Sequence, residues 1–410
     1  MQKLRLVNPT VVSLAGLAIV LFIFTTPYCH SFFDTYGIVS TPSSGSGRPI
    51  AAKNSTRAVA RVPKGCDIFR GEWVPDDGGA VPYYTNRSCP FIQEHQNCMK
   101  YGRPDLGFLR WRWRWRPSGC ELPRFDAAGF LDAVRGRSMA FVGDSLARNH
   151  MQSLMCLLSK VEYPKDVSPT QNQEFRTLHY ASHNFTVSVF WSPFLVKANV
   201  SDSDNGGGRL WNLYLDEPDD AWLPLVAGYD YVVISAATWF TRPSLFYESG
   251  RLVACYYCLV PGVPQLTLRY SLRVAHRTAL RAVASLPGFN GTAIVRTVSP
   301  MSHFEGGEWD KGGDCRRTRP YEARVAGLDL DFYTAQVEEF EAAEKAARER
   351  GVRMVLMDTT AAMVLRPDGH PSRYGHWAHE NVTLYNDCVH WCLPGPIDVW
   401  NEMLLQMLLP

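Results

Sequence analysis

The sequence predicts an α/β fold in which helices cover both faces of a parallel sheet. From Arg137 onward, short apolar segments alternate with longer segments of helical periodicity. This alternation is typical of parallel sheets, because each helix returns the chain to the edge where the next strand begins. The expected strands span 138–142, 229–235, 293–298 and 352–357, and the expected helices span 145–158, 266–285, 328–350 and 397–408.

The best-defined helix is 328–350. The segment from Tyr333 to Arg350 is rich in Ala, Glu and Arg, and Gly351 follows it as a usual helix stop. Residues 65–124, in contrast, are dense in cysteine and aromatic residues and have little helical periodicity. We therefore expect a catalytic domain over 65–410, with a disulfide-tied segment at 65–124 and the α/β core at 125–410.

Tryptophan and arginine alternate strictly from Arg110 to Arg116. A strand would place Trp111, Trp113 and Trp115 on one face and the arginines on the other. One interpretation is a half-buried strand whose tryptophans lie in the core. The other is that one or two of these rings face a cleft and stack on sugars.

The N-terminus carries a candidate membrane anchor. Lys3 and Arg5 precede the apolar run 11–24, and the whole segment 9–28 is long enough to cross a hydrocarbon core. A cleaved signal peptide is the alternative, but no small-x-small site closes the run. We expect an uncleaved signal anchor with a cytosolic tail at 1–8, because positive charge stays on the cytoplasmic side. Residues 29–64 then form a flexible stem rich in Ser, Gly and Pro.

Glycosylation sequons and cysteines indicate that the catalytic domain is lumenal. Eleven cysteines are present, and ten remain when Cys29 beside the anchor is set apart, an even number suited to disulfides. Cys255 and Cys258 are a disulfide or two buried thiols rather than a zinc or redox pair, because no second pair has zinc-ligand spacing. The net charge of +2, with no cluster of basic residues, gives no reason to expect a nucleic-acid partner. The sequons begin at Asn54, Asn86, Asn184, Asn199, Asn290 and Asn381.

Two short motifs predict serine-based acyl chemistry. Gly143-Asp144-Ser145 joins an expected strand to an expected helix, so the Ser145 hydroxyl is exposed beside helix N–H groups. The late segment Asp387-x-x-His390 offers an imidazole to deprotonate that serine and a carboxylate to orient the imidazole. Asp144 is expected to form the turn and to start the helix.

These motifs, with CMKYGRPD at 98–105, CELPRF at 120–125 and WSPFL at 191–195, resemble the plant trichome birefringence-like proteins. The likeness covers about residues 65–410 and the plan of anchor and stem. It implies an SGNH/GDSL-like fold and Golgi polysaccharide O-acetyltransferase activity. The amino-acid sequence of these motifs is most similar to that of the xyloglucan-acetylating subgroup.

The resemblance implies roles for individual residues. Ser145 would be the nucleophile, His390 the general base and Asp387 its orienting carboxylate. Arg148 matches the family's Gly-Asp-Ser-x-x-Arg and would hold an oxyanion or the donor, with a simple salt bridge as the alternative. Gly143 and Asn184 are further oxyanion candidates, although Asn184 is also a sequon. The implied disulfides are Cys66–Cys120, Cys89–Cys156, Cys98–Cys392 and Cys315–Cys388.

The chain departs from many relatives at 235–240, where SAATWF replaces NTGHWW. This removes a polar pair from the expected cleft. Aromatic platforms usually hold neutral sugars, and the candidates near the motifs are Trp111, Trp113, Trp115, Trp191 and Trp239.

The expected function is O-acetylation of a hemicellulose, first of all xyloglucan, through an acetyl-serine in a double-displacement reaction. Mannan or xylan are alternative acceptors. A polysaccharide acetylesterase of the same fold and a non-catalytic polysaccharide-binding protein are the competing functions. We expect no bound cofactor and no metal, with acetyl-CoA or another Golgi compound as the acetyl donor. The expected location is the Golgi membrane as a single-pass type II protein, where a biosynthetic complex is a further expected partner.

Overall fold

The computed structural model describes residues 59–76, 82–114, 120–201 and 210–409. These residues belong to one compact unit that begins at Arg57. The expected cytosolic tail and anchor, and the stem up to residue 58, lie outside the described residues. None of the helices in the described part of the chain is long and apolar enough to cross a membrane.

The central sheet has seven strands in the order β13-β12-β9-β3-β6-β5-β4. Its first five strands run parallel to one another, as the sequence predicted, but β5 pairs antiparallel with β6, and β4 pairs antiparallel with β5, so the sheet is mixed. Only the short 3-10 turn at Ala181–His183 and Asn184 join β5 to β6, and a parallel connection needs a much longer crossover. The strands are β3 (Ser138–Gly143), β4 (Lys165–Asp166), β5 (Phe175–Tyr180), β6 (Phe185–Trp191), β9 (Tyr231–Ser235), β12 (Thr292–Arg296) and β13 (Arg353–Met357).

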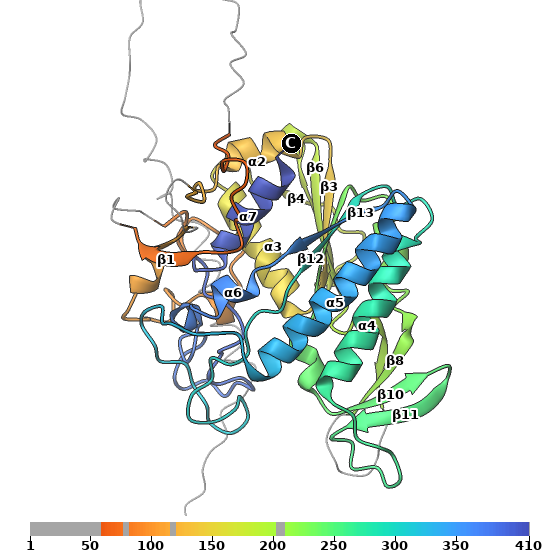
Figure 1. The fold of residues 1–410 in the computed structure, drawn as a ribbon. Helices are drawn as coiled ribbons and strands as arrows, with labels where there is room; N and C mark the ends of the chain where they lie inside the picture. The colour runs from red at the N-terminus through yellow and green to blue at the C-terminus, as the bar shows by residue number, and fades with distance from the viewer. Residues whose placement is uncertain (1–58, 77–81, 115–119, 202–209, 410) are drawn as a thin grey trace, which may run out of the picture. The chain divides into compact units, whose positions relative to one another are not determined.

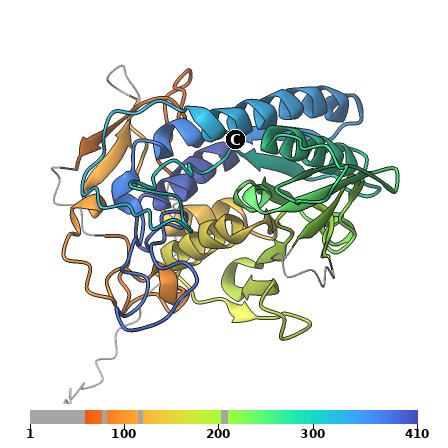
Figure 2. The same cartoon turned by 90° about the horizontal axis from the view of Figure 1, so that it is seen from below.

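Helices cover both faces of this sheet, which confirms that part of the prediction (Figure 1). On one face, Phe141 and Val187 pack with α3 (Ser145–Leu158), α7 (Asp398–Leu408) and α2 (Ala127–Ala133). On the other face, the alternate residues Ala140 and Val142 share a core with α4 and α5. The long helices α4 (Leu268–Ala284) and α5 (Gly327–Glu349) lie side by side on that face, as Figure 2 also shows. All four expected strands and all four expected helices are present, with ends within two residues of the prediction.

A second sheet, which the sequence did not predict, packs against α4 through a separate core. Its order is β11-β10-β8-β7, and a small third sheet pairs β1 with β2. The strands are β1 (Glu72–Pro75), β2 (Trp111–Arg114), β7 (Val196–Val200), β8 (Trp211–Pro218), β10 (Ser244–Glu248) and β11 (Arg251–Tyr256). The remaining short helices are η1 (Glu94–Gln96), η2 (Gly107–Leu109), η3 (Ala181–His183), η4 (Leu223–Val226), η5 (Thr238–Thr241), α6 (Thr360–Met363) and η6 (Pro367–Gly369).

Residues 111–114 of the tryptophan-arginine segment form β2, and Trp113 follows the core interpretation. Trp113 is buried, its ring centroid lies 5.5 Å from that of Trp73, and its indole N–H donates to the Ile68 carbonyl. A ring enclosed in this way has no free face for a sugar, so the expectation that Trp113 is a substrate platform is wrong. Trp111 is half-buried in the same strand, and Trp115 lies outside the described residues.

Five disulfides join the ten cysteines of the folded part. Four are the pairs that the resemblance implied, and Cys255–Cys258 is closed as well rather than being two thiols. Cys98–Cys392 and Cys315–Cys388 tie the segment that contains Asp387 and His390 to two distant parts of the chain.

Candidate active site

Ser145 stands at the carboxyl end of β3, at the first position of α3. Gly143 has φ +147°, and a Cβ at this position would lie 1.7 Å from the Ser235 carbonyl oxygen of the neighbouring strand. Only glycine permits that approach. Asp144 then caps the helix, since its carboxylate accepts the Leu146 N–H at 3.0 Å. The strand, the turn and the cap together present the serine at the edge of the sheet.

The structure brings Ser145, His390 and Asp387 into one hydrogen-bonded chain. His390 Nδ1 lies 2.7 Å from Asp387 Oδ2, and His390 Nε2 lies 2.7 Å from Ser145 Oγ. An ionised carboxylate only accepts, so Nδ1 carries the proton and Nε2 is left to accept the serine proton. This is the geometry of a nucleophile, its base and the group that orients the base.

Asp387 is held in its ionised form. Burial alone would raise the pKa of Asp387, but the charge of His390 and the hydrogen bonds from it keep that pKa well below its usual range. The second carboxylate oxygen accepts the backbone N–H groups of Val389 and His390 at 3.0 and 2.9 Å. The backbone of Asp387 also pairs with Ser372 in both directions, which fixes the loop.

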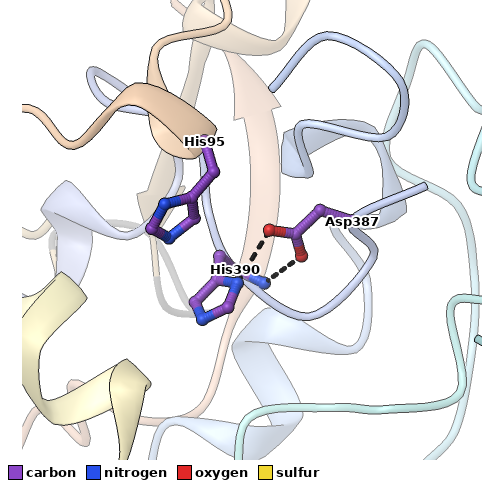
Figure 3. Close-up of side chains that lie close together, drawn as sticks. All are labelled: His95, Asp387 and His390. Carbon is purple, nitrogen blue, oxygen red and sulfur yellow. Dashed lines mark hydrogen bonds and ion pairs between the residues drawn. The ribbon is translucent and has the colours of Figure 1, made fainter. Parts of the chain in front are cut away.

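A third residue beside His390 was not predicted from the sequence. The ring of His95, from η1, meets the His390 ring edge-on with centroids 4.8 Å apart (Figure 3). Burial, and then the charge of His390, lower the pKa of His95 to about 4, so it is neutral at neutral pH. The implied Cys98–Cys392 bridge could have indicated this contact from the sequence. His95 precedes Cys98 by three residues and His390 precedes Cys392 by two, so the bridge brings the two histidines close together.

The ligating atoms of His95, Asp387 and His390 lie within 4.8 Å of one another, which is close enough for a metal ion. However, both ring nitrogens of His390 already contact Asp387 and Ser145. The donor set therefore fits proton transfer better than coordination.

Arg148 and two tryptophans lie next to the nucleophile. Arg148 forms no ion pair with a carboxylate of the described residues, so the salt-bridge alternative is wrong; its guanidinium lies 5.3 Å from the ring centroid of Trp191. Trp191 pairs with Gly143 across the sheet and packs edge-on against Trp239 at 5.2 Å. Trp191 and Trp239 are both half-buried.

Asp144 performs the predicted turn role and a second one. Its other carboxylate oxygen accepts the Ala237 N–H at 3.1 Å and the Thr238 hydroxyl at 2.9 Å. These bonds hold η5, which carries Trp239, against the start of α3. The residues at 235–240 that depart from many relatives therefore still build one wall of the site.

Asn184 does not belong to the site. It follows η3 and directly precedes β6, so it lies at the amino end of that strand, whereas Ser145 follows the carboxyl end of the adjacent parallel strand β3. The length of β6 separates them by about 20 Å at 3.3 Å per residue. The expectation that Asn184 contributes to the oxyanion hole is therefore wrong. Asn184 is exposed, as are the sequon residues Asn199, Asn290 and Asn381; Asn86 is half-buried, and Asn54 lies outside the described residues.

Comparisons with known proteins identify the family models that the chain matches and the proteins that it is similar to. Residues 122–407 match the model of the "GDSL/SGNH-like Acyl-Esterase family found in Pmr5 and Cas1p", and residues 64–121 match the PMR5 N-terminal domain. The chain is 50% identical over 360 residues to trichome birefringence-like protein 19 of Arabidopsis thaliana, covering 87% of this chain and 83% of that protein. It is 44% identical to xyloglucan O-acetyltransferase 4 of Populus trichocarpa, over 84% of this chain and 81% of the relative. It is 41% identical to xyloglucan O-acetyltransferase 1 of Arabidopsis thaliana, over 90% of this chain and 86% of that protein.

Proposed function

The chain belongs to the plant trichome birefringence-like family of GDSL/SGNH-like acyl-esterases, and on this premise we propose that it is a polysaccharide O-acetyltransferase acting on xyloglucan. The hydrogen-bonded chain Ser145–His390–Asp387 is the observation that carries the proposal. The names of the relatives support the xyloglucan acceptor.

The reaction proceeds in two displacements. Ser145 Oγ attacks the carbonyl carbon of the acetyl donor while His390 Nε2 takes the hydroxyl proton, and His390 then gives that proton to the leaving group. In the second step, His390 removes the proton of a sugar hydroxyl, whose oxygen attacks the acetyl-serine. Asp387 keeps His390 in the required tautomer and stabilises its charged form in both steps.

The start of α3 supplies electrostatic stabilisation. The backbone N–H of Ser145 has no hydrogen-bond acceptor among the described residues, and it lies at the positive end of the helix dipole. A donor in this place can bind the oxyanion that develops on the acetyl carbonyl. The participation of Gly143 in the same oxyanion hole stays a prediction.

Trp191 and Trp239 provide a surface for the acceptor. Their half-buried rings lie beside the carboxyl ends of β6 and β9, next to the strand that carries the nucleophile. A neutral sugar that stacks on such rings is held in line with the acyl carbon, where its hydroxyl outcompetes water. This positioning distinguishes a transferase from an acetylesterase with the same triad.

The proposal includes the location and the donor. The sequons and the apolar segment 9–28 support a type II protein of the Golgi membrane, with acetyl-CoA or another Golgi compound as donor.

The test is an acetyl-transfer assay with the full-length protein in detergent. An acetyl donor is offered with xyloglucan, mannan or xylan oligosaccharides, and mass spectrometry follows added acetyl groups. We expect acetylated xyloglucan, and we expect Ser145→Ala to reduce transfer by several orders of magnitude at unchanged thermal stability, because the hydroxyl does not pack in the core. Steady removal of acetyl groups from acetylated xyloglucan, without transfer, would identify an esterase instead. Full activity of a folded Ser145→Ala protein would exclude the covalent mechanism.

A further inference from the structure

Two buried histidines, His303 and His370, lie behind the loop that carries the catalytic base. His303 is in the long connection after β12, His370 directly follows η6, and the two residues are 2% and 1% exposed. The ring of His370 stacks on the ring of Trp391, the residue after the base, with centroids 4.1 Å apart. The two displacements described above use neither histidine.

Three close contacts connect this histidine pair to the backbone and to each other. His370 Nδ1 lies 2.7 Å from the His390 carbonyl oxygen. His370 Nε2 lies 2.6 Å from His303 Nδ1, and His303 Nε2 lies 3.0 Å from the Val364 carbonyl oxygen. Among the described residues, the His390 carbonyl receives no other hydrogen bond. All four ring nitrogens therefore belong to one continuous line of contacts from His390 to Val364.

This line of contacts requires three ring protons. A carbonyl oxygen only accepts, so the two outer contacts need N–H groups at His370 Nδ1 and His303 Nε2. Each neutral imidazole has a single N–H, so two neutral rings would leave two bare nitrogens facing each other at 2.6 Å. Moving either proton to the centre would instead leave a bare nitrogen against a carbonyl oxygen. Only a pair with one added proton satisfies all three contacts, and that pair is a cation.

The surroundings restrict the pair to one added proton. Burial lowers the pKa of His303 and the pKa of His370, so both rings cannot be charged together. A single added proton is held by the hydrogen bonds to both carbonyl groups and by the contact between the rings. Nearby carboxylates favour this proton and nearby guanidinium groups oppose it; the carboxylates are Asp329, Asp368 and Asp387, and the guanidinium groups are those of Arg103 and Arg317.

We propose that the histidine pair shares one added proton near neutral pH, and that His370 thereby acts as a positioning residue for the catalytic base. With a proton between the rings, His370 Nδ1 keeps its own proton and donates it to the His390 carbonyl. The His390 backbone is then held on both sides, since Asp387 accepts its N–H at 2.9 Å. A neutral His370 could carry its only proton on Nε2, which would release the carbonyl. The effect on catalysis rests on the proposed acetyltransferase function, whereas the proton count does not.

The proton count is measured by NMR on the full-length protein with isotope-labelled histidine, without substrate, at about pH 6.5. The pair should contribute three ring N–H protons that exchange slowly with water, because each lies in a buried hydrogen bond. His303→Asn places an amide N–H near the position of His303 Nδ1, so His370 no longer needs an added proton. Only one imidazole proton should then remain, and the count should fall by two.

His276 is the matched control for this count. It is also 1% exposed, but its two contacts need only one ring proton. Its Nδ1 donates to the Leu272 carbonyl at 2.9 Å, and its Nε2 accepts from the Gln336 amide at 3.0 Å. His276→Asn should therefore remove a single ring N–H and should leave kcat unchanged.

Steady-state acetyl transfer to xyloglucan oligosaccharide tests the positioning role. His370→Phe keeps an aromatic ring against Trp391 but cannot donate a hydrogen bond. It should lower kcat about tenfold to hundredfold and keep KM within about twofold, because the base is displaced while the acceptor surface is not altered. His370→Asn retains a donor near the position of Nδ1 and should restore most of kcat. Thermal unfolding of each variant verifies its fold.

Three results are decisive. Two ring protons instead of three in the unaltered protein, or a loss of one instead of two in His303→Asn, would show a neutral pair and overturn the shared proton. Equal kcat values for His370→Phe and His370→Asn would overturn the positioning role. If the unaltered protein transfers no acetyl group, the proposed function fails, and the proton count still decides whether the pair is charged.

Discussion

His95, which lies beside His390, makes the stability of the folded protein depend on pH. Its pKa of about 4 lies below the ordinary value of 6.5, because of burial and the neighbouring charge of His390. The unfolded chain therefore takes up a proton between these pH values that the folded chain does not bind. The free energy of unfolding consequently falls as the pH falls through this window.

We predict that His95→Gln weakens this pH dependence. The variant should lose less stability than the unaltered protein between pH 6.5 and pH 4, as measured by urea unfolding at fixed temperature. A residual slope is expected because burial also lowers the pKa of His276 to about 4. His379→Gln, at an exposed position, is the control. Identical pH profiles for His95→Gln and the unaltered protein would contradict the predicted role of burial.

Trp239 is the residue at which transfer and hydrolysis should separate. Its ring packs against Trp191 and Trp211, and the Arg242 guanidinium lies 3.9 Å from its centroid. Trp239→Ala should shift the product from acetylated sugar towards free acetate, because water then competes better for acetyl-Ser145. Donor attack by Ser145 should be largely preserved, and both products can be quantified in one reaction by mass spectrometry. An unchanged ratio of the two products would remove Trp239 from the acceptor site.

At the level of elements, disulfides fix the loop that carries Asp387 and His390. Cys315–Cys388 closes a separation of 73 residues and adjoins Asp387 directly. Replacing both cysteines by serine should cost about 2–4 kcal/mol of stability and should also lower kcat, because the loop then positions His390 less well. Denaturant unfolding and the transfer assay measure the two effects.

The matched control for that variant is the replacement of Cys255 and Cys258 by serine. Their bridge spans a separation of only three residues at the end of β11, and neither cysteine adjoins a triad residue in the sequence. This variant should keep its kcat. If both double variants lose activity alike, the specific positioning role of Cys315–Cys388 is excluded.

At the level of the whole molecule, the predicted topology can be tested in membranes. Glycosidase treatment of the protein from plant membranes should lower its mass, because Asn184, Asn199, Asn290 and Asn381 are exposed sequon residues. An N-terminal tag should remain accessible to protease in sealed vesicles, since Lys3 and Arg5 precede the apolar segment. An unglycosylated protein with a protected N-terminus would overturn the type II assignment.

The sequence by itself predicted four strands of the central sheet, the four longest helices and the candidate catalytic residues. Local signals were sufficient for β3, α3 and the long helices, because periodicity, the Asp144 cap and the Gly351 stop act over a few residues. The Gly-Asp-Ser turn and the late Asp-x-x-His could also be recognised in the sequence, because each is a contiguous motif whose residue types indicate its chemistry.

Only the tertiary structure decided which distant groups meet. Asn184 was a reasonable oxyanion candidate until the parallel pairing of β3 with β6 placed it at the opposite end of the sheet from Ser145. His95 became a neighbour of His390 through long-range packing beside the Cys98–Cys392 bridge. Sequence patterns are local, whereas the contacts that create a site join residues hundreds of positions apart, and for this reason the place of His95 beside His390 became visible only in the fold.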